Sequence, residues 1–503
     1  MSNQELEEKL RKKISEIAEN LGGDLDYKVL LTLIFYKVLS DKWMEKVKEY
    51  SEKFTETQAY ILANRSYYVL YDESEKKLLT WHESVKERES SAKIISNLSR
   101  IIKLNPEFDR MDVLVENLKI FTAPEYIERF EKIIDGFSTV DFSKISPEVL
   151  NSIFMWILSS YVPEEKSQKK SGEKGEEFRV TPPEVGKLLI ELLDIEPNST
   201  VLDPALGSGS FLVYAYRHAE SKEPDPQIML YGQEIRPYIA AIAKINMILN
   251  GIKNYQIFIG DSLANPQFSN LEIDYALTDP RWNQKYDVDN LKTKPEVKKI
   301  YTTYATNGFP PKKSMDWAWI QLLLYFSKKK AGIVIDNGVL FRGKSEKRIR
   351  KEIVEKDLIE AVIQLPPIFG KEKRAGAIII FNKNKPEGRK GKVLFINASE
   401  EYEKHPEISA MNRIGEKHIE KILNVYREFK DIEGFARVVT LEEIAKNDYN
   451  LNVSLYVTPV EEEEKIDLEK EVEELISLEN KRSEITLKIA ELTKNIVSAL
   501  KGG

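Results

Sequence analysis

The tetrapeptide Asp279-Pro280-Arg281-Trp282 follows an apolar run and combines a carboxylate, a backbone carbonyl and an aromatic ring. One reaction that needs these three groups is the modification of the exocyclic amine of adenine. This amine is a poor nucleophile, because its lone pair is delocalised into the ring. A side-chain acceptor and a carbonyl that take its two hydrogens can turn that lone pair toward an electrophile. Asp279 and the carbonyl of Pro280 fit these roles, and Trp282 can stack on the base. A base in duplex DNA must first be flipped out of the stack.

A glycine-rich turn, "VLDPALGSGSFLV", precedes this motif in the chain and contains Gly207, Ser208 and Gly209. Glycines let the backbone approach a ligand closely, and the helix that follows offers unpaired N–H groups. Glu234 ends the next apolar run, where a carboxylate can accept both hydrogen bonds of a ribose diol. Asp261 ends the third run, within reach of an adenine edge. Together these residues indicate a nucleotide-like cofactor.

Two cofactor classes use this layout, the nicotinamide dinucleotides and S-adenosylmethionine. The dinucleotide fingerprint requires a third glycine for close packing of helix and strand, and Leu212 stands there instead. Asp203, which precedes the turn, would repel a pyrophosphate but can sit near the cationic methionine amino group. The sequence therefore favours S-adenosylmethionine over a dehydrogenase cofactor.

The elements that must position these residues alternate along the chain. We predict strands in the apolar, β-branched runs and helices between most of them; the runs are 199–204, 228–234, 255–261, 273–280, 331–337, 359–366 and 375–382. This alternation is typical of a doubly wound, Rossmann-like α/β domain with a parallel sheet covered on both faces. Ligands bind such sheets beyond the carboxyl ends of the strands, where Asp203, Glu234, Asp261 and Asp279 stand.

Three domains are predicted. Residues 1–165 have apolar residues at helical spacing and form an all-helical domain, residues 166–460 form the α/β domain, and residues 461–503 form a long C-terminal helix. The charged stretch 162–178 reads as a mobile linker or flap. The C-terminal helix carries one apolar stripe, which needs a partner inside or outside the chain; it consists of Leu468, Val472, Leu475, Leu478, Ile485, Ile489, Leu492 and Ile496.

Composition restricts the chemistry further. The 503 residues include no cysteine and four histidines, which excludes disulfides, thiolate zinc sites and cysteine nucleophiles and disfavours a histidine-rich metal site. We therefore expect no metal. No secretory signal or membrane-spanning run is evident, so we expect a cytoplasmic protein. The net charge of −7 argues weakly against nucleic-acid binding, although the basic stretches 167–179 and 341–352 could contact phosphates or be solvated surface.

The motifs resemble those of a known family, the modification subunits of type I restriction-modification systems. "DPRW" resembles the Asn/Asp-Pro-Pro-Phe/Tyr signature of amino methyltransferases. The likeness extends over nearly the whole chain, through "GEEFRVTPPEV", "DPALGSGSFL", "YGQEIRPYIAAIAKINMILNGI", "GKVLFINAS" and "NDYNLNVSLYV". The resemblance implies a class I S-adenosylmethionine-dependent domain that methylates the N6 atom of adenine in DNA.

Carried over by position, the resemblance implies three groups of site residues. The segment ahead of the first strand would fold over the cofactor; it comprises Phe178, Arg179, Val180, Thr181, Pro182 and Pro183. The glycine turn, Glu234 and Asp261 would contact the cofactor as well, with Asp261 on its adenine. Asp279, Pro280 and Trp282 would hold the target base.

The resemblance also implies partners. Double-stranded DNA would be the substrate, and a separate specificity subunit would read its sequence. Two modification subunits typically join one specificity subunit, and a restriction subunit could complete the assembly. The C-terminal stripe would pair with helical spacers of the specificity subunit, with packing inside this chain as the alternative.

Three departures from the family pattern bear on activity. Arg281 replaces a second proline, which removes a rigid φ beside the catalytic carbonyl. Asp279 stands where this subfamily usually has asparagine, and Arg179-Val180 where an aromatic residue is frequent. Two alternatives therefore stay open beside DNA methylation: a catalytically weak scaffold that binds cofactor and DNA, and a protein glutamine methyltransferase.

Overall fold

The computed structural model of the chain describes residues 3–19, 27–86, 90–161, 180–306, 308–370, 373–405, 411–458 and 468–501. The predicted linker, residues 162–178, lies outside the described residues, as do the candidate residues Phe178 and Arg179. The described chain divides into two compact units, Met1–Thr458 and Pro459–Gly503. The predicted domain boundaries at 165 and 460 stay predictions.

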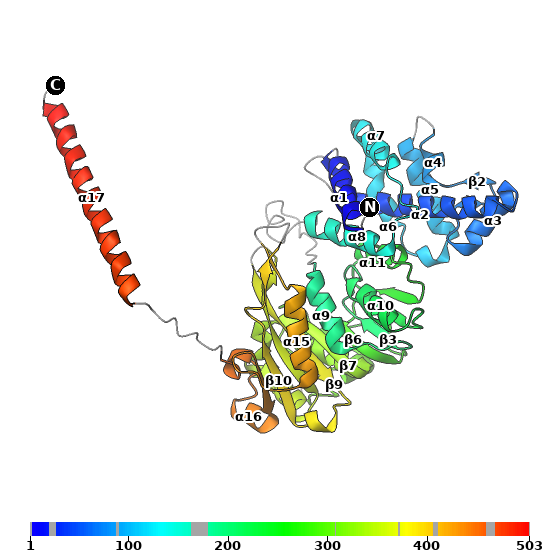
Figure 1. Cartoon of the computed structure of the whole chain (residues 1–503). Coiled ribbons are helices and arrows are strands. Elements are labelled where there is room, and N and C mark those ends of the chain that lie inside the picture. The colour runs from blue at the N-terminus through cyan, green and yellow to red at the C-terminus, as the bar shows by residue number, and fades with distance from the viewer. Residues whose placement is uncertain are drawn as a thin grey trace. The chain divides into compact units, whose positions relative to one another are not determined.

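The first part of the larger unit is almost entirely helical (Figure 1). Its helices are α1 (Asn3–Glu19), α2 (Tyr27–Ser51), α3 (Glu56–Ser66), α4 (Trp81–Ser84), α5 (Ser90–Leu104), α6 (Val113–Leu118), α7 (Pro124–Ser138) and α8 (Pro147–Tyr161), with a small hairpin of β1 (Tyr71–Asp72) and β2 (Lys77–Leu78). Helix α2 is buried along most of its length, because its run of apolar residues faces neighbours on every side.

The sheet in the rest of this unit has the order β13-β10-β8-β9-β7-β6-β3-β4-β5 among the described residues. Its strands are β3 (Thr200–Asp203), β4 (Met229–Glu234), β5 (Tyr255–Ile259), β6 (Ile273–Thr278), β7 (Ser327–Asp336), β8 (Ile359–Phe369), β9 (Arg374–Asn382), β10 (Lys392–Asn397) and β13 (Ala436–Thr440). All seven predicted runs form strands, and the Rossmann-like methyltransferase class is confirmed.

The prediction of a parallel sheet is wrong for two of the strands. Strand β9 runs antiparallel to both β7 and β8, and β13 runs antiparallel to β10. A parallel neighbour needs a crossover of a dozen or more residues, and only a short turn separates β8 from β9. The five strands from β5 to β7 are parallel, so the part of the sheet that carries the candidate site has the predicted topology.

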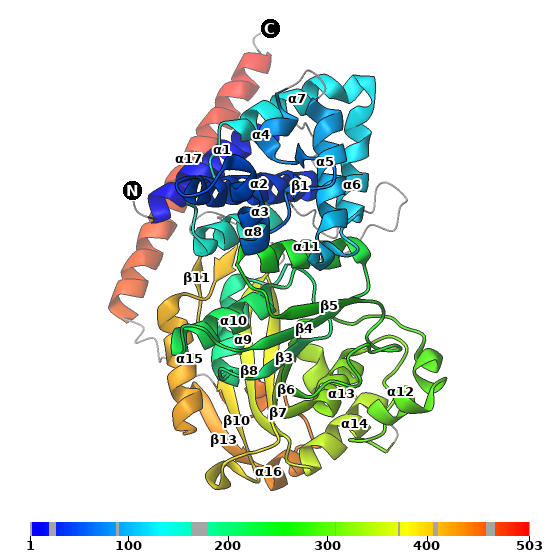
Figure 2. The same ribbon diagram turned by 90° about the vertical axis from the view of Figure 1, so that its right-hand side faces the viewer.

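Helices cover the sheet on both faces (Figures 1 and 2). One face packs on α9 (Pro183–Leu193), α10 (Ser210–Lys222) and α15 (Glu416–Glu428), and the other on α13 (Asp316–Phe326), α14 (Lys344–Glu355) and α16 (Leu441–Lys446). A short helix, α12 (Pro295–Ile300), precedes α13, and β11 (Glu403–Lys404) pairs with β12 (Asn412–Arg413). Helix α11 (Pro237–Leu249) shares one apolar core with the N-terminal helices.

The smaller unit contains one described helix, α17 (Leu468–Lys501). Its apolar stripe is exposed at the described positions Val472, Leu475, Leu478, Ile485, Ile489 and Leu492. Within the described ranges, no helix is long and apolar enough to cross a membrane.

Candidate active site

The predicted site lies where the strand order changes direction. Strand β3 pairs with β4 on one side and with β6 on the other, so the chain crosses from β3 first one way and later the other. A crevice forms at such a switch point beyond the carboxyl ends of the strands. Asp203 and Asp279 therefore stand at the ends of neighbouring strands. A hydrogen bond from the hydroxyl of Thr278, the last residue of β6, to Asp203 joins these ends across 75 residues of sequence.

A cleft of about 2130 Å³ opens at this edge. Most of the predicted residues line it, namely Val180, Thr181, Pro182, Pro183, Gly207, Glu234, Asp261, Asp279, Pro280 and Trp282. Asp203, Ser208 and Gly209 are not among the lining residues. Helix α8 of the N-terminal part also contributes side chains to the cleft, including Met155 and Trp156, which nothing in the sequence pattern indicated.

The carboxylate of Glu234 is held in place at the end of β4. The backbone N–H of Gly207 donates to its Oε2 over 3.1 Å, and the N–H and Nε of Arg236 donate to its Oε1 over 3.0 Å each. Glu234 is buried while still lining the cleft. The glycine turn and the predicted ribose acceptor thus form one hydrogen-bonded unit.

Asp261 is fixed in a similar way. The backbone N–H of Leu263 donates to its Oδ1 over 2.9 Å, and the hydroxyl of Tyr286 donates to its Oδ2. Tyr286 comes from the loop that follows the Asp279 motif. This contact ties the predicted cofactor-adenine site to the predicted target-base site, and the sequence reasoning missed Tyr286 because no local pattern relates it to Asp261.

The turn itself needs its glycines. Gly207 and Gly209 have φ angles of +53° and +76°, in the left-handed region that other residues rarely adopt. A Cβ on Gly209 would also lie 2.9 Å from the terminal methyl of Met247 in α11. The following backbone is fixed from α11 as well, because Asn246 Nδ2 donates to the carbonyl of Ser208 over 3.0 Å.

The turn also contacts the N-terminal helices. Ser210, the first residue of α10, donates from its hydroxyl to the sulfur of Met155 in α8 over 3.1 Å. Ser210 and Ser208 share a hydrogen bond of 2.7 Å between their hydroxyls. Both serines are buried, so Ser208 belongs to the support of the turn rather than to the cleft surface.

Asp203 is buried, with 2% of its surface exposed. Its Oδ1 accepts from the hydroxyl of Thr278 over 2.8 Å and from the N–H of Ala205 over 3.1 Å. Burial, reinforced by the nearby charges of Asp279 and Glu234, raises the pKa of Asp203 to about 7. The predicted contact of this carboxylate with a methionine amino group stays a prediction.

Asp279 is oriented by two other predicted residues. The hydroxyl of Thr181 donates to its Oδ2 over 2.6 Å, and the indole N–H of Trp282 lies 3.1 Å from its Oδ1. The same indole N–H lies 3.3 Å from the carbonyl of Val334 in β7. Thr181 reaches Asp279 across 98 residues of sequence, so the segment expected to cover the cofactor contacts the expected catalytic acceptor directly.

The ring of Trp282 is packed tightly into the cleft wall. It meets Phe369 edge to face with ring centroids 4.8 Å apart, and a Cβ on Gly376 would lie 2.7 Å from its Cη2 atom. Only 8% of Trp282 is exposed. A second indole, that of Trp319, also lines the cleft and donates to Gln284 Oε1 over 3.2 Å. Trp319 was not among the predicted residues, and its position in the apolar run of α13 hides it.

Arg281 is exposed and lines the cleft beside Asp279. Its neighbours Asp279, Pro280 and Trp282 line the cleft as well.

The residues present suit S-adenosylmethionine. Two carboxylates, Glu234 and Asp261, are fixed at neighbouring strand ends and suit a ribose diol and an adenine edge. The left-handed turn at 207–209 allows close approach of a ligand to the backbone. No group of three or more histidine, aspartate or glutamate side chains within the described ranges could hold a metal ion.

Comparison with known proteins gives concordant matches. The family model described as N-6 DNA Methylase matches residues 145–465. The MjaVII methylase subunit of a type I restriction enzyme from Methanocaldococcus jannaschii is 48% identical over 97% of this chain and 85% of its own length. The MjaVIII methylase subunit from the same organism is 44% identical over 94% of this chain and 82% of its own length. A solved type I restriction-modification methyltransferase subunit from Streptococcus thermophilus superposes with a TM-score of 0.73 at 26% identity, covering 90% of this chain and 99% of that one.

Proposed function

Because the chain belongs to the N-6 DNA methylase family, as a type I restriction enzyme methylase subunit, we propose that its cleft methylates N6 of a flipped adenine in DNA. Its methyl donor is S-adenosylmethionine, as in the methyltransferases that it resembles. The same relationships favour this function over a protein glutamine methyltransferase and over a scaffold without catalysis.

In the proposed mechanism Asp279 and the carbonyl of Pro280 accept the two hydrogens of the adenine amine. Thr181 and Trp282 hold the Asp279 carboxylate in one orientation before substrate arrives. Each carboxylate oxygen can accept two hydrogen bonds, so the amine can bind beside these donors or in place of one. Such prior orientation avoids reorganisation when positive charge develops on the nitrogen.

In this mechanism Asp279 would also accept the proton that leaves the amine. S-adenosylmethionine supplies an electrophilic methyl group when it is bound. The bond from the amine nitrogen to the methyl carbon would form as the carbon–sulfur bond breaks, leaving a neutral thioether, and the Asp279 carboxylate would accept the proton that the nitrogen loses. Trp282 forms part of the wall against which the flipped base packs.

The cofactor is proposed to bind at the glycine turn and the two strand-end carboxylates. Glu234 would accept from the ribose hydroxyls, and Asp261 would accept from the adenine amine. Thr181, Pro182 and Pro183 would cover the cofactor from the start of α9. The hydrogen bond from Thr181 to Asp279 supports this arrangement, because it places the covering segment against the catalytic acceptor.

Partners follow from the family. We propose that the subunit acts with a specificity subunit that reads the DNA sequence, and that a second copy of this chain joins the same complex. A restriction subunit is a further proposed partner. The exposed stripe of α17 supports a coiled-coil contact with the specificity subunit. Because its substrate is cellular DNA, the proposed location is the cytoplasm.

The observation that carries the proposal is the fixed carboxylate of Asp279 between Thr181 and Trp282 at the mouth of the cofactor cleft. The test uses the chain co-purified with its specificity subunit, tritiated S-adenosylmethionine and DNA that contains the recognition site. We expect label in adenine with the native complex and none with Asp279→Ala. The matched control is Asp287→Ala, an exposed carboxylate eight residues away. Undiminished labelling by Asp279→Ala would refute the assignment of this residue.

A further inference from the structure

Asn283 is one of the residues that anchor the loop carrying the catalytic motif. This residue follows Trp282 and has a φ angle of +55°, a left-handed conformation that costs a non-glycine residue energy. Its backbone N–H donates to Asp316 Oδ1 over 3.3 Å, and its side-chain Oδ1 accepts from Arg342. Asn283 is therefore held through both its main chain and its side chain.

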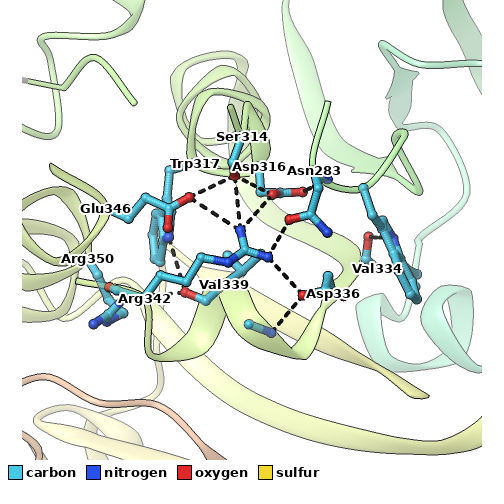
Figure 3. Close-up of polar contacts among 12 residues, drawn as sticks. Asn283, Ser314, Asp316, Trp317, Val334, Asp336, Val339, Arg342, Glu346 and Arg350 are labelled. Atoms are coloured by element: carbon cyan, nitrogen blue, oxygen red, sulfur yellow. Dashed lines mark hydrogen bonds and ion pairs between the residues drawn. The ribbon is translucent and has the colours of Figure 1, made fainter. Parts of the chain in front are cut away.

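Arg342 is the centre of the network that holds it (Figure 3). Its Nη2 donates to Asn283 and, over 2.9 Å, to Asp336 at the end of β7. Its Nη1 lies 3.1 Å from the hydroxyl of Ser314, 3.3 Å from Asp316 Oδ2 and 3.5 Å from Glu346 Oε1. One planar guanidinium thus joins the catalytic loop to β7, to the start of α13 and to α14, which a point charge could not do.

Two carboxyl groups of the network contact the same serine hydroxyl. The Ser314 hydroxyl lies 2.6 Å from Asp316 Oδ2 and 2.7 Å from Glu346 Oε1, yet it has a single hydrogen to donate. Both short contacts are satisfied only when one of the two carboxyl groups is protonated and donates to the serine oxygen. Burial raises the pKa of both acids, which agrees with this count.

The backbone of Arg342 is fixed as well. The fully buried Arg350 donates from Nη1 to the carbonyl of Arg342 over 3.0 Å and to that of Val339 over 3.3 Å, while its Nε donates to the carbonyl of Tyr449 over 2.6 Å. The guanidinium of Arg342 lies against Gly338, where a Cβ would approach its Nη2 to 2.8 Å. The side chain therefore has little freedom to turn away from Asn283.

We propose that Arg342 is a positioning residue for methyl transfer, which holds the Asp279–Trp282 loop in its active geometry through Asn283. The inference rests on the proposed function of that loop. Arg342 is not among the residues that line the cleft, so its influence on the reaction must pass through a neighbour. The need for such a clamp follows from Arg281, because this residue lacks the rigid φ that a second proline would give the loop.

The test measures methyl transfer under single-turnover conditions with the co-purified complex. We expect Arg342→Met to lower the rate on the order of 10- to 100-fold, because small displacements of a reacting group cost this much. The affinity for S-adenosylmethionine, measured by calorimetry, should stay within about twofold of the native value, because backbone N–H groups outside the network hold Glu234 and Asp261. Arg342→Lys should keep most of the thermal stability but not the rate.

A double-mutant cycle tests the route through Asn283. Asn283→Gly keeps the left-handed backbone accessible and removes only the side chain. If Arg342 acts through this side chain, the double variant with Arg342→Met is no slower than Arg342→Met alone. Losses that multiply would overturn the proposal, and so would a native rate in Arg342→Met or in Arg342→Lys.

Two further variants separate positioning from folding and from the proposed function. Gly338→Ala keeps every charge but places a Cβ 2.8 Å from both Arg342 Nη2 and Asp336 Oδ1, so this ion pair must shift, and transfer should slow even if Arg342→Met fails to fold. Arg348→Met, at an exposed arginine of α14, is the control and should transfer at the native rate. A native complex that does not methylate DNA refutes the proposed function, whereas an active complex with undiminished Arg342→Met and Gly338→Ala refutes only the clamp.

Discussion

Replacing the buried Asp203 by asparagine should make the protein more stable at neutral and alkaline pH. The pKa of this carboxyl is raised by burial from its ordinary value of 3.8 to about 7. The folded chain therefore binds more protons than the unfolded chain between these two values. The contribution of this carboxyl to the free energy of unfolding is fully present below pH 3.8, falls as the pH rises through this window, and is lost above pH 7. The difference between the two pKa values corresponds to a loss of roughly 4 kcal/mol in the free energy of unfolding.

Asparagine keeps the geometry while removing the titration. Its Oδ1 can still accept from Thr278 and Ala205, so the hydrogen bonds at the end of β3 survive. The free energy of unfolding of Asp203→Asn, less that of the native protein, should grow by roughly 3 kcal/mol between pH 5 and pH 8. Urea unfolding of the whole chain, followed by circular dichroism across this range, measures the difference. Asp225→Asn, at an exposed position, controls for the loss of one negative charge.

A difference that does not change with pH would refute the reasoning, because it would mean that Asp203 does not titrate in this window. The same group also tests the predicted contact with the cofactor. If the methionine ammonium approaches Asp203, binding near pH 7 lowers the pKa of the carboxyl and releases a proton. Calorimetry in buffers of different ionisation enthalpy should detect that proton with the native protein and none with Asp203→Asn. No release from the native protein would exclude the contact.

Two other substitutions probe the walls of the site. Gly376→Ala places a Cβ 2.7 Å from the indole of Trp282, so the indole must move. We expect the methylation rate to fall on the order of 10-fold in a labelling assay. A native rate would mean that the position of the ring does not affect methylation. Tyr286→Phe removes the hydroxyl that donates to Asp261, a bond to a charged group worth about 1.5–3 kcal/mol, and should weaken cofactor binding on the order of 10-fold in calorimetry. The control is Tyr449→Phe, which removes a similar hydroxyl–carboxylate bond remote from the cleft and should bind the cofactor with native affinity. An unchanged cofactor affinity in Tyr286→Phe would contradict the proposed role of the Tyr286 hydroxyl.

The sequence predicts the strands of the sheet well, because buried parallel strands are short, continuous β-branched runs with polar ends. It also predicts that Glu234, Asp261 and Asp279 line the same cleft, because parallel strands end at the same edge of a sheet. It does not reveal β13, a short edge strand whose alternation is weak, nor the antiparallel direction of β9. Such direction depends on the length of a turn rather than on the run itself.

The supporting contacts of the site could not be predicted. Thr181 and Asp279 lie 98 residues apart, and Arg342 lies 59 residues from Asn283. A hydrogen bond over such separations leaves no periodicity in the chain, and a charged residue in a basic stretch looks like solvated surface. The charge of the stretch 341–352 predicts solvated surface or a phosphate contact, whereas the structure places its Arg342 at the centre of a part-buried network.

The hydrogen bond from Ser210 to Met155 and the apolar core shared by α11 and the N-terminal helices have a thermodynamic consequence. The glycine turn rests on the same helices that would move if a macromolecule reoriented the N-terminal part of the chain. Any such binding event that shifts α8 changes the affinity of the turn for its ligand, and the ligand must change the affinity for the macromolecule by the same factor. Such a coupling would let the N-terminal helices sense whether the glycine turn is occupied.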